Sequence, residues 1–393
     1  MSAVQPFPTL TQPPQATGLA PLEQKPDGGW LVRGYAEARQ ILMGDVRQAG
    51  FKAEIVEKMP GYMTKPVLYQ HGQVHREQRS QTARFFTPAA VQQRHMPLIE
   101  ARVEEIIAGF QRQRRADLNQ LAALLATSVV AEVVGLTAAP NAALAGRLDG
   151  ILHADLNYSD GLVGFFKSLK VQLATLTFYY SDVAPAVRAR RKQPREDVIS
   201  YLLEKKYSGA EIMAECITYG AAGMVTTQEF ICVVAWHLLQ DEARRQAFLT
   251  GEREARYDML HELLRLEPVV GSLYRRAASE LSLTSGSESR AFPAGTLFEL
   301  DLRAINTDAR LLGAHPLDFN PQRELEKGLN NSVMGFGSGP HRCAGEHIAI
   351  AETDVFLRRL LALPGLRVEA PPRVGYNDTI KGYELRGFWL SLD

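Results

Sequence analysis

The chain has 393 residues, of which 46% are hydrophobic and 22% are charged. This composition is typical of a folded globular protein, and three cysteines are too few for a disulfide-stabilised scaffold. The 44 Lys and Arg residues equal the Asp and Glu residues in number, so the formal net charge is zero. Without a global field to attract nucleic acid, and without 18 consecutive apolar residues, we expect neither nucleic acid nor a membrane as partner.

The predicted elements form a mainly α fold with a small β region, in a single large domain over residues 22–393. Residues 1–21 are rich in Pro and Gln and lack the features of a signal peptide, which predicts a flexible arm on a cytoplasmic protein. The segment 50–73 has no clear periodicity. Helical periodicity predicts helices at 35–43, 96–112, 118–134, 161–180, 197–206, 211–242 and 344–361. Strands are expected at 30–32, 281–283, 296–300, 366–369 and 388–392.

The strongest local signal is a loop over residues 335–345 that contains Cys343. Three glycines and a proline fall within residues 335–340, which excludes a helix or strand interior. Cys343 directly precedes the helix predicted over 344–361, where free N–H groups and the helix dipole favour a thiolate. Considered alone, Cys343 also fits a buried structural cysteine beside a loop.

This loop resembles a known signature. Its residues Phe336, Gly339, His341, Cys343 and Gly345 fill every position of the haem-ligand pattern of the cytochrome P450 family, Phe-x-x-Gly-x-His/Arg-x-Cys-x-Gly. The resemblance implies the cytochrome P450 fold and a haem b cofactor, iron protoporphyrin IX, with the Cys343 thiolate as axial iron ligand. Because such a thiolate favours O–O cleavage, it also implies a monooxygenase.

Other landmarks resemble the same family. Glu262 and Arg265 match its ExxR pair, and Arg323 within 319–323 matches the arginine that joins the pair to brace the ligand loop, a structural role. His75 and Arg79 resemble the HxxxR motif, and Arg275 falls where the family binds a propionate, with Arg276 as the alternative. The resemblance implies that four side chains hold the haem propionates: His75, Arg79, Arg275 and His341. Without it, His71 and His75 at i, i+4 also suit a metal pair.

The long helix departs from the family pattern at one position. Ala222, Gly223, Thr226 and Thr227 match the family's oxygen-activating turn, but Val225 stands where the family has an acid. The resemblance makes Thr226 and Thr227 the catalytic candidates, and Thr226 can also bend the helix by bonding the Ala222 carbonyl. Small residues at this turn fit a helix-packing face as well. Glu229, one turn further along, is a candidate for the missing acid.

Together these features predict an oxidoreductase of secondary metabolism. We expect a haem-thiolate monooxygenase that oxidises a bulky apolar or aromatic small molecule with O₂ and electrons from ferredoxin and ferredoxin reductase. Proton delivery is expected to be atypical. Alternatives are oxidative coupling, peroxide-driven turnover, a non-catalytic haem-binding sensor or carrier, and a helical interaction protein without a cofactor. Candidate substrate contacts are the segment 50–73 and six aromatic residues between 158 and 180. Candidate docking residues for the electron donor are Arg76, Arg84 and Arg342.

Overall fold

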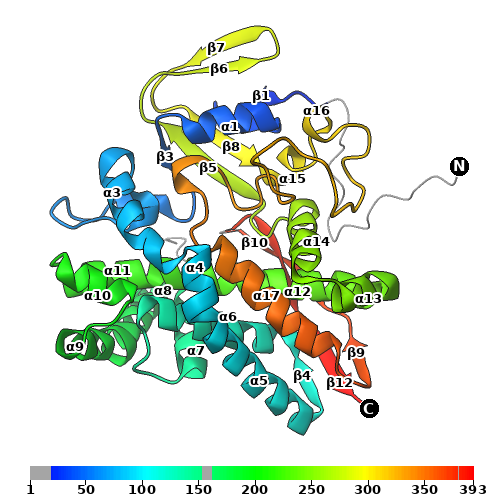
Figure 1. Ribbon diagram of the computed structural model, residues 1–393. Coiled ribbons are helices and arrows are strands. Elements are labelled where there is room, and N and C mark those ends of the chain that lie inside the picture. Colours follow the sequence, from blue (N-terminus) through cyan, green and yellow to red (C-terminus); the bar gives the residue numbers. More distant parts are fainter. Residues whose placement is uncertain (1–18, 153–161, 379) are drawn as a thin grey trace, which may run out of the picture.

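The computed structural model describes residues 19–152, 162–378 and 380–393, so most of the predicted arm and residues 153–161 lie outside this description. The described chain is mainly helical, with its largest sheet on one side of the helices (Figure 1). The predicted fold class is therefore confirmed.

The helices form the larger part of the molecule. They are α1 (Tyr35–Met43), α2 (Ala53–Glu57), α3 (Gly72–Thr82), α4 (Pro88–Ala90), α5 (Met96–Gln113), α6 (Leu118–Val134), α7 (Asn141–Leu152), α8 (Leu162–Phe178), α9 (Ala184–Lys192), α10 (Val198–Glu204), α11 (Gly209–Gly220), α12 (Thr226–Gln240), α13 (Glu242–Thr250), α14 (Arg253–Leu266), α15 (Leu302–Ile305), α16 (Ala309–Leu312) and α17 (Glu346–Leu361). Within the described residues, π-helical turns join helices at η3 (Val91–His95), η4 (Tyr179–Val183) and η5 (Ala221–Val225).

The strands form one five-stranded sheet and three smaller sheets. They are β1 (Leu22–Gln24), β2 (Trp30–Val32), β3 (Val46–Gln48), β4 (Arg115–Asp117), β5 (Ser272–Ala277), β6 (Leu281–Ser285), β7 (Glu288–Phe292), β8 (Leu297–Asp301), β9 (Leu366–Ala370), β10 (Arg373–Asn377), β11 (Gly382–Arg386) and β12 (Trp389–Leu392). The large sheet has the order β1-β2-β8-β5-β3, in which only β2 and β8 run parallel. The β6–β7 hairpin projects beyond it (Figure 1).

Two hydrophobic clusters hold the fold together. The larger one joins the helices, and a smaller one joins α1 to the five-stranded sheet. Val270, between α14 and β5, packs against both clusters, so the helical and the sheet regions share one continuous interior.

The predicted long helix is continuous in space but is built from α11, η5 and α12. The Ser208 hydroxyl and the Glu211 carboxylate form a capping box that starts it at Gly209, two residues before the predicted start. It ends at Gln240 because Asp241 is extended and its carboxylate accepts the Arg244 N–H to begin α13. The helix crosses the middle of the molecule behind α17 (Figure 1).

The long helix also passes a length and composition test for a membrane span. Gly209–Gln240 has a mean hydropathy of 1.3 over its most apolar window, and 72% of that window is buried inside the protein. A mostly buried core helix passes the same test, so this segment is weak evidence for a membrane. The packing of the fold accounts for its apolar surface.

Several short strands were not predicted. In β3, Val46 pairs with Ala277 and Gln48 pairs with Arg275, more than 200 positions away in the sequence. A strand of three residues carries too little alternation to be recognised, and only the distant partner stabilises it. The segment 50–73, expected to be irregular, contains the short helix α2 and the 3₁₀ turn η1 (Val67–Tyr69).

Candidate functional site

The Cys343 loop lies between α1 and the start of α17. Its turn is closed by the Cys343 backbone N–H, which donates to the Phe336 carbonyl over 2.9 Å. Gly339 has a φ of +70°, and a Cβ there would collide with the carbonyl oxygen of Leu42 at the end of α1. Only glycine combines this conformation with so close an approach. The backbone of the Cys343 loop therefore packs directly against the end of α1.

The Cys343 side chain has accessible surface, but protein atoms surround it closely. By accessible surface it is the exposed one of the three cysteines, yet burial raises its pKa above the usual value. The Gly345 backbone N–H hydrogen-bonds the sulfur and acts in the opposite direction. The helix-terminal donors expected from the sequence are therefore present, but desolvation outweighs them, and a bound cation would be needed to favour the thiolate strongly.

A group of cationic side chains lies next to this loop. The imidazole rings of His75 and His341 stack with their centroids 3.9 Å apart, and Arg79 donates to the Arg342 carbonyl over 2.5 Å. Arg275 is buried, with its Nη1 donating to the Gln48 side chain over 2.6 Å and its Nε without a partner. The four side chains assigned to the propionates thus come from α3, β5 and the Cys343 loop.

No carboxylate among the described residues forms an ion pair with these four side chains. Burial, together with the charges of Arg79, Arg76 and Arg275, lowers the pKa of His75 to about 4. The pKa of His341 falls to about 3 through burial and the nearby His75 and Arg275, and burial alone lowers that of Arg275 to about 10. With these values both imidazoles are neutral at neutral pH, whereas Arg275 is a buried cation and Arg79 a half-buried one. Cations without a counterion are costly to bury, so the cluster is suited to an anionic group. These residues fit a haem whose two propionates supply that charge.

Two alternatives left open by the sequence are resolved by placement. Arg276 is exposed and donates to the Gly295 carbonyl over 2.9 Å, away from the cluster, whereas Arg275 lies in it. His71 and His75 have no third ligand: the described parts of the chain contain no group of three His, Cys, Asp or Glu side chains suited to a metal ion. The cluster therefore has the chemistry of an anion site.

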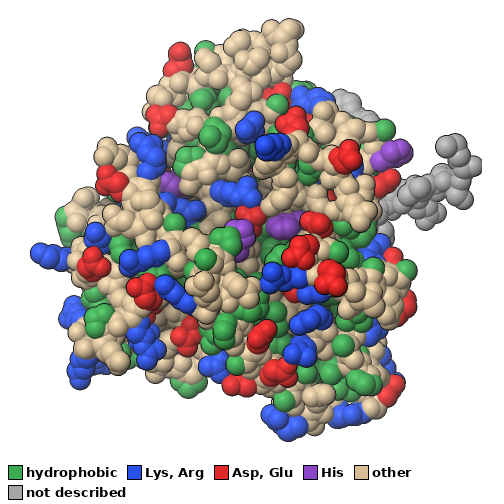
Figure 2. Space-filling view, in the orientation of Figure 1, with side chains coloured by type: hydrophobic (Ala, Val, Ile, Leu, Met, Phe, Trp, Pro, Cys, Tyr) green, Lys and Arg blue, Asp and Glu red, His purple; other side chains and the backbone are tan. Residues whose placement is uncertain are grey.

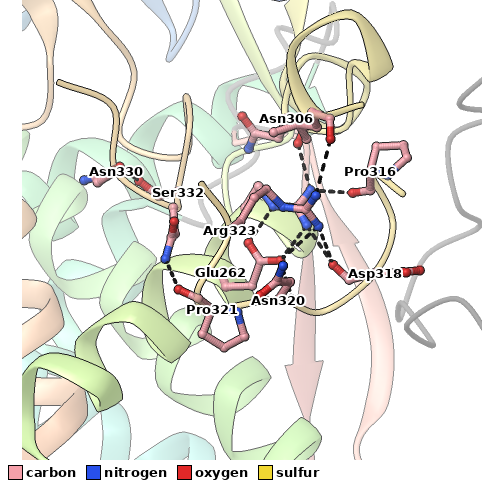
Figure 3. Close-up of polar contacts among 12 residues, drawn as sticks. Glu262, Asn306, Pro316, Asp318, Asn320, Pro321, Arg323, Asn330 and Ser332 are labelled. Carbon is pink, nitrogen blue, oxygen red and sulfur yellow. Dashed lines mark hydrogen bonds and ion pairs between the residues drawn. The ribbon is translucent and has the colours of Figure 1, made fainter. Parts of the chain in front are cut away.

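The ExxR pair on α14 lies in a polar network with the loops around residues 306–323; Glu262, Asn306 and Arg323 of this network are labelled in Figure 3. Glu262 accepts two bonds of 2.7 Å from Arg265, and neither side chain is exposed. Arg265 also donates to the carbonyls of Asn306 and Pro316, over 3.0 and 2.6 Å. Arg323 lies 3.7 Å from Glu262. The network thus ties α14 to the loops that lead into the Cys343 loop.

Asn320, in the same segment as Arg323, contacts the ExxR pair through its backbone. The Asn320 N–H donates to Glu262 over 2.9 Å (Figure 3). The Asn320 side chain instead accepts the Gln322 N–H over 3.1 Å. The contact with the ExxR pair therefore does not depend on the side chain at this position.

The π-helical turn η5 coincides with the predicted oxygen-activating turn. Thr226 donates to the Ala222 carbonyl over 2.5 Å, the bond expected to distort the helix. Ala222 is exposed although it lies within a mostly buried helix, so this turn also faces space. Val225 is buried and places no acid there.

Glu229 does not replace the missing acid. Its carboxylate accepts the Leu385 N–H over 3.0 Å and an Arg386 N–H over 2.5 Å, which directs it towards β11. Burial raises its pKa, with Arg386 acting against the shift. Glu229 therefore fixes the C-terminal hairpin to α12.

Glu352 on α17 is a buried acid next to the Thr226 turn that sequence reasoning missed. It is 2% exposed, and its Oε2 atom has no partner. Burial raises its pKa to about 8, and a hydrogen bond with Thr227 opposes this shift. The available signal was a glutamate on an apolar helix face, between Ile348 and Phe356 at i−4 and i+4. Thr227 thus connects the turn beside Thr226 to a protonated acid.

Comparison with known proteins agrees with this geometry. A family model described as Cytochrome P450 matches residues 257–378. The chain is 27% identical over 361 residues to nocardicin C N-oxygenase of Nocardia uniformis subsp. tsuyamanensis, covering 87% of this chain and 84% of the relative. It is 26% identical over 315 residues to pulcherriminic acid synthase of Bacillus subtilis (strain 168), covering 77% and 75%. The chain belongs to the cytochrome P450 family.

The fold of this P450 is shared with solved structures of the family. The crystal structure of CalO2 superposes with a TM-score of 0.78 at 22% identity, covering 95% of this chain and 93% of CalO2. As a bacterial-type P450, the protein is an oxidoreductase of the monooxygenase class, which uses a haem-thiolate cofactor, a redox partner and a small-molecule substrate.

We predict that Glu262→Gln destabilises this P450 strongly. The substitution leaves the buried Arg265 guanidinium without its counter-charge, at a cost of about 3–5 kcal/mol. Urea unfolding measures the loss, and haem content per chain should fall with it. Glu254→Gln is the matched control on α14, since Glu254 is 79% exposed and should change stability by less than about 0.5 kcal/mol. Equal stability of the two variants would contradict the bracing role.

Proposed function

We propose that this P450 binds haem b through the Cys343 thiolate and oxidises a bulky apolar small molecule with O₂ and electrons from a ferredoxin-type donor. The observation that carries the assignment is the pairing of an accessible thiol with a cluster of two histidines and two arginines, in which the arginines lack a counterion among the described residues. When bound, the haem supplies the oxidative chemistry. The chain holds and orients it, excludes water and manages protons.

In this proposal, His75, Arg79, Arg275 and His341 bind the two propionates. Charge-assisted hydrogen bonds of this kind are about twice as strong as neutral ones, and the low dielectric of the interior strengthens them further. Phe336 packs against the helical core, and its ring lies 5.9 Å from that of His261, which shields the sulfur side from water. Gly345 donates its N–H to the sulfur.

The electron donor is proposed to dock on the face that carries α3 and α17. Figure 2 shows that acidic and basic side chains are interspersed over this face rather than gathered in one basic field. Arg76 is exposed, whereas Arg342 forms bonds of 2.9 Å to both oxygens of Glu346, and Arg84 lies 4.0 Å from Glu196. Of the three candidates, Arg76 is therefore the one whose charge is least neutralised by a neighbouring carboxylate. A cytoplasmic location remains part of this proposal.

The aromatic segment between 158 and 180 gives less support for an aromatic substrate than the sequence suggested. Tyr158 lies outside the described residues, Phe178 is fully buried in the core and Tyr180 is 68% exposed. The proposal of an apolar substrate is supported instead by Ala222 and Val225, two apolar residues of the π-helical turn next to Thr226. This favours a substrate without a charged group at the oxidised position.

We propose that Glu352 supplies the proton that an acid at position 225 would otherwise deliver. Burial keeps its carboxyl group protonated at neutral pH, and the Thr227 hydroxyl contacts it from α12. A hydroxyl donates and accepts at once, so Thr227 can pass a proton from Glu352 towards the Thr226 turn. The acid and the turn belong to neighbouring helices, so the path is fixed by packing.

The first test of the proposed function is turnover. With ferredoxin, ferredoxin reductase and NADPH, we expect a compound that shifts the haem absorbance to stimulate NADPH consumption and to yield an oxygenated product. Binding and spectral shifts without any product would favour a non-catalytic sensor or carrier. Turnover with hydrogen peroxide alone, and none with the electron donor, would favour a peroxide-driven enzyme.

The second prediction concerns proton delivery. Glu352→Gln keeps the size of the side chain but has no acidic proton, so we expect NADPH consumption to continue while product per NADPH falls by about tenfold or more. Thr227→Val should act in the same direction. Product per NADPH, measured together with peroxide release, is the relevant quantity.

Rescue distinguishes a proton role from a structural one. We expect Val225→Asp to restore coupling in the Glu352→Gln background, because it returns a carboxyl group to the turn itself. A double variant that stays uncoupled, or a single variant that remains fully coupled, would contradict the role of Glu352.

A further inference from the structure

Two carboxylates of α11 hold the chain segment 64–70 by its backbone. Glu211 accepts the Thr64 N–H over 2.6 Å, and Glu215, one helical turn later, accepts the Val67 N–H over 2.9 Å. Spacing of i, i+4 places both acids on one helix face. The segment is therefore attached to the same helix at two points, Thr64 and Val67.

Glu215 also joins a third element. The same Oε1 atom accepts a bond of 2.7 Å from the Gln78 side chain on α3, while its Oε2 atom is buried without a partner. The side chain is 1% exposed. One oxygen atom thus links η1, α3 and α11, and any movement of the segment away from α11 must break its bond.

The surroundings of Glu215 contain no compensating cation. The titratable groups that interact with it electrostatically are Tyr201, Tyr207, Cys216 and Tyr219. Glu211 lies one turn away on its own helix, and the charge of Arg79 acts on Tyr219. Among the described residues, no Lys, Arg or His forms an ion pair with Glu215. Its charge is therefore opposed chiefly by hydrogen-bond donors.

The attached segment borders both elements that frame the proposed haem site. It runs directly into α3, which carries His75 and Arg79, and α11 continues into the π-helical turn beside Thr226. Tyr62, two residues before Thr64, is 87% exposed. The segment therefore follows an exposed residue and precedes the helix that carries His75 and Arg79.

We propose that Glu215 is a positioning residue that clasps the segment 64–70 over the entry to the substrate site when protonated and releases it when ionised. The clasp itself rests only on the contacts of Glu211 and Glu215, and its role in substrate entry rests on the proposed function.

The direction of the pH response follows from burial. Desolvation raises the pKa of Glu215 from 4.5 to about 7, against its bonds from Gln78 and Val67. When the segment lifts, the carboxyl group regains water and its ordinary pKa. The closed form therefore holds a proton that the open form loses, so opening is favoured as pH rises from about 5 to 7 and then levels off.

Glu211 does not share this response. Although burial acts to raise its pKa, bonds from the Thr64 and Ser208 backbone lower it to about 2. It stays ionised over the whole range and serves as a fixed attachment. Glu215 is then the titrating member of the pair.

Amide hydrogen exchange of the haem-loaded protein tests the clasp directly. After correction for intrinsic exchange, we expect protection of the Val67 amide to fall by up to tenfold per pH unit between about pH 5 and 7. Glu215→Gln carries no charge and should keep its protection constant over this range. Glu211→Gln, the control, should lower protection at Thr64 and leave the pH response at Val67 intact. Protection of Val67 that does not vary with pH, or the same fall in Glu215→Gln, would overturn the proposal.

The entry role has a separate readout. The association rate of 4-phenylimidazole with the haem is compared between wild type and Glu215→Gln, so that titration of the probe cancels in the ratio. We expect this ratio to rise between pH 5 and 7. A constant ratio alongside pH-dependent exchange would overturn the entry role and leave the clasp standing, whereas failure to load haem would count against the proposed function alone.

Discussion

The position of the Cys343 sulfur depends on a loop whose regular structure is limited to one short 3₁₀ turn, η6 (Gly339–His341). Three contacts fix it: the Phe336–Cys343 backbone bond, the approach of Gly339 to Leu42, and the bond from Arg79 to the Arg342 carbonyl. The buried network of Glu262 and Arg265 holds the chain that leads into the loop. A ligand sulfur must be placed within fractions of an ångström, so much of the polar interior of this P450 serves that single placement.

Electrostatics define the rest of the site. One side presents a thiol whose pKa burial raises, and the other presents buried His and Arg side chains without a counterion. Each arrangement is unfavourable alone, and in our proposal a bound haem would relieve both, because it would bring a cation to the sulfur and carboxylates to the arginines. Burial acts in the same way at Glu352 and Glu215, two acids whose pKa values it raises to about 8 and about 7.

Local patterns predicted the fold class and the positions of the main landmarks. The helices at 35–43 and 118–134 were predicted to the residue, because a cap or a glycine marks their ends. The Cys343 loop could be recognised because its chemistry lies in consecutive residues. Long-range pairings such as β3 with β5 could not be predicted, since the partners lie far apart in the sequence.

Contacts between helices were equally inaccessible to sequence reasoning. Glu229 looked like a substitute for the acid missing at Val225, but β11 binds its carboxylate, and Glu352 from α17 reaches Thr227 instead. Likewise, nothing in the segment 50–73 indicates that Glu215 holds it. In both cases the decisive partner is a buried acid on another element.

The central claim is that Cys343 binds the haem iron, and the carbon monoxide difference spectrum of the reduced protein tests it most directly. We expect the wild type to show the strongly red-shifted band of thiolate ligation, and Cys343→Ser to lose that band while keeping its helical circular dichroism. A folded Cys343→Ser protein that retains the band would contradict the account.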